Sequence, residues 1–177
     1  MEPLHYFLQG KRGVGKSTVI RKTLEIIMVD HAPILGGFFT WNGGMDDPNV
    51  YMRPARQETS GESYRLASWD SGSRRMTCET SVFDREGARL LSETRGSDLI
   101  IMDELGYLES AAAAFRQAVM DRLAGSTPVF GVLLLGDVPW HDGIKSDPRV
   151  RLIDVDELNR DTLPQELAAM LRPAVRK

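Results

Sequence analysis

Short apolar runs and segments with helical spacing of apolar residues follow one another along this chain. The runs have the length and composition of buried strands, and they predict strands over 5–8, 33–40, 98–103, 129–135 and 150–155. Apolar residues spaced three or four apart mark one face of a helix. They predict helices directly after position 17 and over 84–93, 110–123 and 163–171. Buried strands that alternate with amphipathic helices indicate a mostly parallel sheet with helices on both faces.

Two segments do not fit this alternation. Residues 41–54 are rich in Gly, Asp, Asn and Pro, and we expect an irregular structure there. Residues 62–70 and 74–82 predict two strands joined by Ser71-Gly72-Ser73, a sequence suited to a β-hairpin. We expect this peripheral hairpin outside the parallel core or at its edge. The whole pattern predicts a three-layer α/β fold in one domain over residues 1–177.

Composition and charge narrow the class of protein. The net charge of −3 and the pI near 5.7 give no general basic surface, so we do not expect nonspecific binding to nucleic acid. Cys78 is the single cysteine and forms no internal disulfide. We see no secretory signal, and the apolar run 129–135 is far shorter than the about 20 residues that span a bilayer. We therefore predict a cytoplasmic protein without membrane contact, and the sequence identifies no protein partner.

A glycine-rich segment between the first predicted strand and the first helix carries the clearest chemistry. Gly10, Gly15, Lys16 and Ser17 have the spacing G-x-x-x-x-G-K-[ST] of a phosphate-binding loop. Glycines let successive backbone N–H groups surround phosphate oxygens, and the following helix directs its N-terminal dipole at the same anion. We predict that Lys16 contacts the β- and γ-phosphates and that Ser17 binds Mg²⁺. The predicted nucleotide-binding residues of this loop are Gly10, Lys11, Arg12, Gly13, Val14, Gly15, Lys16, Ser17 and Thr18.

Two acidic residues end the most apolar strand, and ligands of open α/β sheets bind outside that end of the strands. Asp103 is predicted to hold Mg²⁺ together with Ser17, directly or through a water molecule. Glu104 is predicted to orient and deprotonate an attacking water. The candidate catalytic residues are therefore Lys16 and Glu104, and the candidate metal ligands are Ser17 and Asp103.

The segment Leu99-Ile-Ile-Met-Asp-Glu-Leu-Gly-Tyr-Leu-Glu109 resembles the second motif of the thermophile-type nucleoside triphosphatases, also called the cancer-related nucleoside triphosphatase family. That motif ends in Asp-Glu-Ile-Gly-x-Met-Glu. Three further segments are similar to the family's Gly-Gly-Phe-Tyr-Thr, Ile-Lys-Ser and Asn-Arg-Asp sequences: Gly36-Gly-Phe-Phe-Thr40, Ile144-Lys-Ser146 and Asn159-Arg-Asp161. The resemblance covers nearly the whole chain. It implies Mg²⁺-dependent hydrolysis of nucleoside triphosphates such as ATP or GTP, with loose base preference, on a RecA-like P-loop sheet.

One segment departs from the family's pattern. The family follows Phe-Tyr-Thr with Glu-x-Arg, whereas this chain has Trp41-Asn42-Gly43-Gly44 there. Arg53 and Arg56 follow, and we interpret them as solvated loop residues rather than as cations for the γ-phosphate. We interpret the three tryptophans, Trp41, Trp69 and Trp140, as packing residues.

Asn159 and Arg160 allow two interpretations. They could contact the nucleobase or ribose, because the last strand of such sheets often frames the base. The segment could instead simply start the last helix, since Thr162 and Gln165 have capping-box spacing and Pro164 suits a first helical turn.

Hydrolysis is one of three functions that a phosphate-binding loop permits. A kinase for a nucleotide or small molecule usually needs a closing lid with several arginines, and the connection 136–148 carries Lys145 as its only Lys or Arg. A switch protein that binds nucleotide and hydrolyses it slowly is the third possibility. The loop by itself does not separate these functions, because all three bind the same phosphates.

Overall fold

The computed structural model describes residues 3–29, 32–56 and 61–175. Within these residues an eight-stranded sheet has the order β5-β4-β3-β2-β6-β7-β1-β8. The strands are β1 His5–Gln9, β2 Leu35–Asn42, β3 Val50–Pro54, β4 Tyr64–Asp70, β5 Arg75–Cys78, β6 Leu99–Leu105, β7 Val129–Leu133 and β8 Val150–Asp154. The helices are α1 Lys16–Met28, α2 Thr80–Val82, α3 Ala88–Ser92, α4 Ala113–Ala124, α5 Asp142–Lys145 and α6 Leu163–Val175. A π-helical turn, Phe83–Gly87, joins α2 to α3, and a 3₁₀ turn, Pro139–His141, precedes α5.

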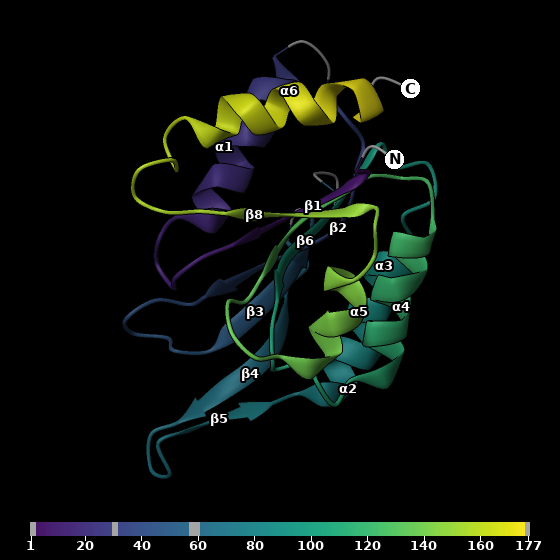
Figure 1. Ribbon diagram of the computed structural model, residues 1–177. Coiled ribbons are helices and arrows are strands. Elements are labelled where there is room, and N and C mark those ends of the chain that lie inside the picture. Colours follow the sequence, from purple (N-terminus) through teal and green to yellow (C-terminus); the bar gives the residue numbers. More distant parts are fainter. Residues whose placement is uncertain (1–2, 30–31, 57–60, 176–177) are drawn as a thin grey trace.

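The molecule has three layers, with α1 and α6 on one face of the sheet and α2 to α5 on the other (Figure 1). The five strands β2, β6, β7, β1 and β8 are parallel, whereas β3, β4 and β5 continue the sheet in antiparallel pairs. This confirms the predicted three-layer α/β architecture and the place of the β4–β5 hairpin at the sheet edge. The central parallel strands β6 and β7 are almost completely buried, as their apolar sequences require, whereas the parallel edge strand β8 is only partly buried.

Two separate apolar cores lie on the two faces of the sheet. Leu8, Ile20 and Leu167 belong to the core under α1 and α6, and Phe38 and Phe115 belong to the core on the opposite face. Burial of these side chains removes apolar surface from water and fixes α1 against the sheet. Both ends of the loop between β1 and α1 are therefore held by packing. None of the described helices combines the length and the apolar composition needed to cross a membrane.

The prediction of an irregular structure over 41–54 was wrong at both ends of the segment, where the structure has strands. β2 continues through Asn42, and Val50–Pro54 forms β3, which pairs antiparallel with β2 so that Thr40 faces Met52. Met52 is fully buried although polar and turn-forming residues surround it in sequence. The ladder with β2 and the burial of Met52 stabilise a strand whose local sequence, including Pro54, disfavours one.

The second strand of the predicted hairpin is shorter than expected, and the helix after it begins earlier. β5 ends at Cys78, and helical structure starts at Thr80 instead of residue 84. The backbone N–H of Glu79 donates to the Leu66 carbonyl at 2.7 Å and closes the ladder there. The chain then turns onto the sheet so that the Phe83 ring meets the Phe115 ring, with 5.4 Å between centroids. Tertiary packing of Phe83 thus overrides the strand propensity of Thr80 and Val82.

Candidate active site

The loop between β1 and α1 has the backbone of an anion-binding turn. Gly10, Gly13 and Gly15 have φ angles of 155°, 79° and 109°, which side-chain-bearing residues rarely adopt. A Cβ atom on Gly10 would also collide with the carbonyl oxygen of Val155. Gly15 is the N-cap of α1, so free N–H groups of the first helical turn lie at the loop. The loop therefore has the backbone geometry on which the prediction of phosphate binding depends, and phosphate binding itself stays a prediction.

The ammonium group of Lys16 is held inside this loop. Its Nζ donates to the carbonyl oxygens of Gly10 at 2.9 Å and Lys11 at 3.1 Å, and the residue is 7% exposed. Two neutral carbonyls are weaker partners for an ammonium group than phosphate oxygens are. Lys16 is therefore positioned to exchange these carbonyl contacts for charge-assisted bonds to a bound phosphate.

Ser17 brings the loop into contact with the acidic strand end. Its Oγ donates to Oδ1 of Asp103 at 3.1 Å, across 86 positions of sequence. Asp103 is 2% exposed, and burial raises its pKa to about 7, while the Ser17 hydrogen bond and the charge of Lys16 lower it. A positive charge near this carboxyl would favour its ionised form. The two predicted metal ligands therefore lie together in a position that suits a cation.

The donor set fits Mg²⁺ bound to a nucleotide. A hydroxyl and a carboxylate are the hard oxygen ligands that Mg²⁺ prefers, and phosphates and waters complete its shell. Among the residues that the structure describes, no cluster of three or more His, Cys, Asp or Glu could hold a metal ion by itself. A site of two protein ligands needs the phosphate oxygens as well, so metal and nucleotide would bind here together.

Glu104 extends from the strand end toward the same loop. Its backbone N–H donates to Oγ1 of Thr40 at 3.1 Å, which ties the end of β6 to β2. Burial raises the pKa of its carboxyl, and the positive charges of Lys16 and Arg12 lower it. A half-buried carboxylate with a raised pKa is a better proton acceptor than a solvated one. Thr40 was not among the sequence candidates, although its place in the Gly36–Thr40 motif was a signal for it.

Glu109 is a further buried acid that the sequence reading did not use. Its carboxylate accepts the backbone N–H of Gly106, and the indole Nε1 of Trp140 donates to the Gly106 carbonyl at 2.8 Å. These contacts fold the loop that follows Glu104 back on itself. The residue is 2% exposed, and burial raises its pKa to about 7. Glu109 therefore positions the loop that follows β6. Its place at the end of the Leu99–Glu109 motif was the sequence feature from which this role could have been predicted.

Replacing Glu109 by Gln should remove a pH dependence of stability. The folded protein keeps this proton up to pH about 7, whereas a free Glu loses it near 4.5. The unfolded state thus gains from ionisation first, and stability from this group is lost as pH rises through 7. We expect Glu109→Gln to gain about 1 to 3 kcal/mol relative to the parent on going from pH 5 to pH 8, because the amide cannot ionise.

Urea unfolding at the two pH values measures this difference. Asp103 also has a pKa of about 7, but it is present in both proteins, so its contribution to the pH dependence cancels in the comparison. Glu157→Gln, at an exposed position in the turn after β8, is the matched amide control. An equal stability difference at pH 5 and pH 8 would contradict burial of a neutral carboxyl at Glu109.

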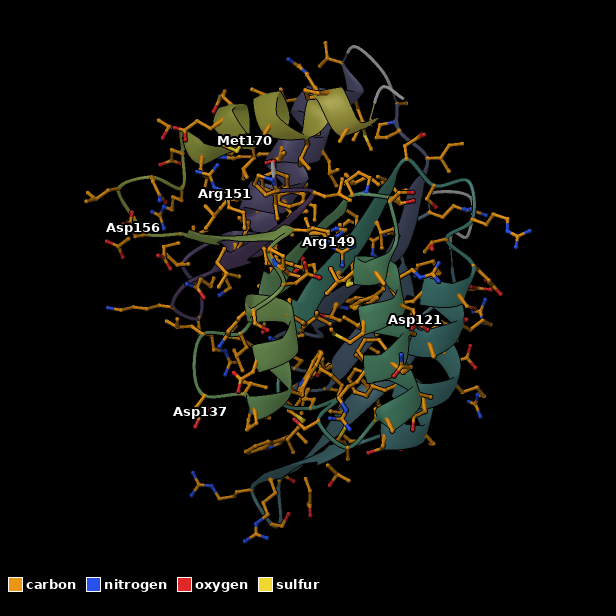
Figure 2. All side chains as sticks on the ribbon, turned by 45° about the vertical axis from the view of Figure 1, so that its right-hand side comes forward. Asp121, Asp137, Arg149, Arg151, Asp156 and Met170 are labelled. Atoms are coloured by element: carbon orange, nitrogen blue, oxygen red, sulfur yellow. The ribbon has the colours of Figure 1, made fainter. Side chains whose placement is uncertain are left out.

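Asn159 and Arg160 lie in the turn after β8. Because β8 and β6 lie on opposite sides of β1 in the sheet, these two residues approach the phosphate loop from the side away from Asp103 and Glu104. The Asn159 side chain accepts the N–H of Asp156 at 3.0 Å and donates to the Asp154 carbonyl at 2.8 Å, so it closes the turn. Arg160 reaches the loop itself, with Nη1 at 3.4 Å from the Val14 carbonyl. Figure 2 shows Asp156 of this turn and Asp137, from the loop after β7, on the same side of the molecule. The structure thus brings Arg160, rather than the Asn159 side chain, to the phosphate loop.

The other side chains considered in the sequence lie in three different places. Trp69 lies on the peripheral hairpin and is 41% exposed, and the Trp140 indole donates to the Gly106 carbonyl. Among the described residues, no hydrogen bond joins either tryptophan to the phosphate loop. Trp41 and Arg53 line a cavity that begins at Ser17 and Asp103. Cys78 is partly buried, its thiol donates to the Leu108 carbonyl, and burial raises its pKa.

The order β2-β6-β7-β1-β8 places the acidic strand β6 two positions from the strand that carries the phosphate loop. This arrangement, with Lys16 in the loop and Ser17 bonded to Asp103, defines the class of P-loop nucleotide-binding proteins with a RecA-like sheet. The sequence profile of the NTPase family matches residues 5–168. The chain belongs to that family.

Individual relatives agree with this assignment over nearly their whole lengths. The Nucleoside-triphosphatase THEP1 of Natranaerobius thermophilus is 28% identical over 95% of this chain and 96% of its own length. The Cancer-related nucleoside-triphosphatase homolog of Mus musculus is 24% identical over 95% of this chain and 96% of its own. The crystal structure of THEP1 from Aquifex aeolicus has the same fold, with a TM-score of 0.76, 22% identity, and coverage of 94% of this chain and 98% of that chain. The sequence-based identification of the family is confirmed.

Proposed function

We propose that this protein is a nucleoside-triphosphate phosphohydrolase that converts nucleoside 5′-triphosphates to diphosphate and phosphate, depends on Mg²⁺ and has a loose base preference. Membership of the NTPase family supports the hydrolase assignment. The observation that carries the proposal is the contact between Ser17 and Asp103, since it joins the phosphate loop to the acidic strand end. A loop alone would equally suit a protein that only binds phosphate.

Each residue of the site has a proposed part in the reaction. The N–H groups of residues 10–18 bind the phosphates, and Lys16 neutralises charge on the β- and γ-oxygens. Ser17 and Asp103 would hold Mg²⁺, which supplies further positive charge to the phosphates when it is bound. Glu104 accepts the proton of the attacking water. The water oxygen then bonds to the γ-phosphorus, while the bond between this phosphorus and the oxygen that bridges it to the β-phosphate breaks, and the diphosphate leaves. Arg160 contacts the nucleotide from the β8 side, and Asn159 holds its turn.

The connection between β7 and β8 favours water over another acceptor. Residues 136–148 contain the 3₁₀ turn and α5, and the fully buried Ile144 anchors them to the sheet. A kinase lid is a mobile segment that brings arginines to the phosphates and excludes water. This packed segment, with Lys145 as its only Lys or Arg, does not have those properties.

Phosphate release from a panel of nucleoside triphosphates, with Mg²⁺ or excess chelator, tests the proposal. We expect turnover to require Mg²⁺ and the specificity constants for ATP and GTP to lie within about a hundredfold of each other. The reason is that the Asn159 amide already bonds to the backbone, so the phosphates provide most of the binding. Discrimination of many thousandfold would contradict the loose preference, and full activity in chelator would contradict the metal site.

A further inference from the structure

A cavity of about 520 Å³ lies beside the phosphate loop, between α1 and the strands β2 and β3. Its volume is in the range that binds small ligands. Ser17, Thr18 and Asp103 form one end, and the rest of the wall comes from the side of α1 and from β2 and β3. Within the described part of the chain, this wall includes neither residues 10–16 nor Arg160. The cavity therefore adjoins the triphosphate site without being the phosphate cradle.

One wall of the cavity is an aromatic surface. The Trp41 ring packs against the Tyr51 ring with 5.5 Å between centroids and 21° between planes, and Trp41 is still 38% exposed. Phe39 lies two residues earlier on the same side of β2 and also lines the cavity. The apolar remainder of the wall consists of Leu24, Met28, Leu35 and Ala55. A planar ring can stack on such a supported aromatic side chain.

A cation lies next to this aromatic surface. The guanidinium of Arg53 sits over the Phe39 ring, 5.1 Å from its centroid, and the residue is exposed. This cation–π contact holds the guanidinium over the ring, and the N–H groups of an arginine in such a contact can still bind an anion. No carboxylate of the described residues forms a salt bridge with Arg53, whereas Arg21, the other arginine of the wall, is 3.4 Å from Glu25. Arg53 is thus the cation of this wall that an incoming anion would meet.

We propose that this cavity binds a second small molecule, an aromatic ring carrying an anionic group such as a nucleoside 5′-monophosphate, with its ring on Trp41 and its anion at Arg53. The inference rests on the proposed function, because Ser17 and Asp103 mark the end of the cavity that would face the terminal phosphate. Trp41 stands where the family's pattern has Glu, so this chain has an aromatic surface where that pattern has an acid. The ligand would occupy the side of the site nearest β2.

The strand order argues against the base of the triphosphate itself in this cavity. The turn after β8 brings Arg160 to one side of the phosphate loop, and β8 is a neighbour of β1. The cavity lies toward β2 and β3, on the other side of β7 and β6 in the same sheet. A triphosphate whose base lies on the Arg160 side therefore leaves the cavity open to a second ligand.

Calorimetric titration with AMP, GMP and UMP tests this proposal, with the parent protein saturated by Mg²⁺ and a non-hydrolysable ATP analogue. We expect one monophosphate to bind per chain. Ribose 5-phosphate, which lacks the aromatic base, and adenosine, which lacks the phosphate, should each bind at least about tenfold more weakly. Absence of saturable binding by every monophosphate, or displacement of the analogue by them, would overturn the proposal.

Four variants separate the cavity from general surface effects. Trp41→Ala and Arg53→Ala should each weaken monophosphate binding by at least about tenfold, whereas Trp41→Phe, which keeps a ring, should retain it within about fivefold. Trp69→Ala, at a similarly exposed tryptophan outside the cavity, is the matched control. Equal weakening in Trp69→Ala, or unchanged binding in Arg53→Ala, would contradict the site.

Hydrolysis measured without any monophosphate keeps this test independent of the proposed function. Arg53→Ala should hydrolyse Mg²⁺-ATP within about threefold of the parent, since its removal should take no contact from the transition state. Among the described residues, no hydrogen bond or salt bridge joins Arg53 to Lys16, Asp103 or Glu104. If the parent itself does not hydrolyse triphosphates, the proposed function fails, while binding of the monophosphate still decides the cavity.

Discussion

Glu104→Gln is expected to lower kcat for triphosphate hydrolysis by about 10² to 10⁴, the usual contribution of a positioned general base. The amide has the size of the carboxylate and can still hydrogen-bond to water, but it does not accept the water's proton. The backbone N–H of residue 104 bonds to Thr40, so the loop should keep its position. The Kd of the triphosphate should therefore change little, and the loss should lie in kcat.

Single-turnover hydrolysis and nucleotide titration with the same variant separate these two quantities. Asp103→Asn is the contrasting variant, because it should raise the Mg²⁺ concentration needed for turnover, whereas Glu104→Gln should not. Hydrolysis by Glu104→Gln within about tenfold of the parent would show that this residue does not activate the water. The kinase or switch interpretation would then gain support.

Lys16→Ala is the second change with a large expected effect. A charge-assisted contact between Lys16 and the phosphates is worth about 1.5 to 3 kcal/mol, so triphosphate affinity should fall by roughly tenfold or more. Turnover should fall as well, because the same ammonium group neutralises charge that develops on the phosphate oxygens. Titration with a fluorescent triphosphate and steady-state phosphate release measure the two effects.

Lys22→Ala provides a matched control on the same helix. Lys22 lies on α1 with its side chain 45% exposed and 3.7 Å from Asp161, and surface ion pairs of this kind contribute little. Because Lys16 also bonds to the Gly10 and Lys11 carbonyls, urea unfolding of Lys16→Ala must show that the protein still folds cooperatively. Parent-like affinity and turnover in a folded Lys16→Ala protein would place the active site elsewhere.

Much of the architecture was predictable because the central parallel strands are buried on both faces. Continuous apolar runs such as 98–103 and 129–135 have few other environments in a folded chain, and most of each run lies in a strand, β6 or β7. The antiparallel extension was predicted less well. β3 contains Pro54 and follows a turn-rich segment, so its ladder with β2, rather than its own sequence, makes it a strand.

Lys16, Ser17, Asp103 and Glu104 could be assigned roles from sequence because phosphate and Mg²⁺ binding require particular residue types at fixed spacing or at a strand end. The sequence by itself thus determined the phosphate loop, the acidic strand end and the α/β class. Only the tertiary structure decided which distant groups meet: Ser17 with Asp103, Thr40 with the N–H of Glu104, Arg160 with Val14, and Arg53 with Phe39. These contacts depend on strand order and register, which bring together residues that no local pattern relates.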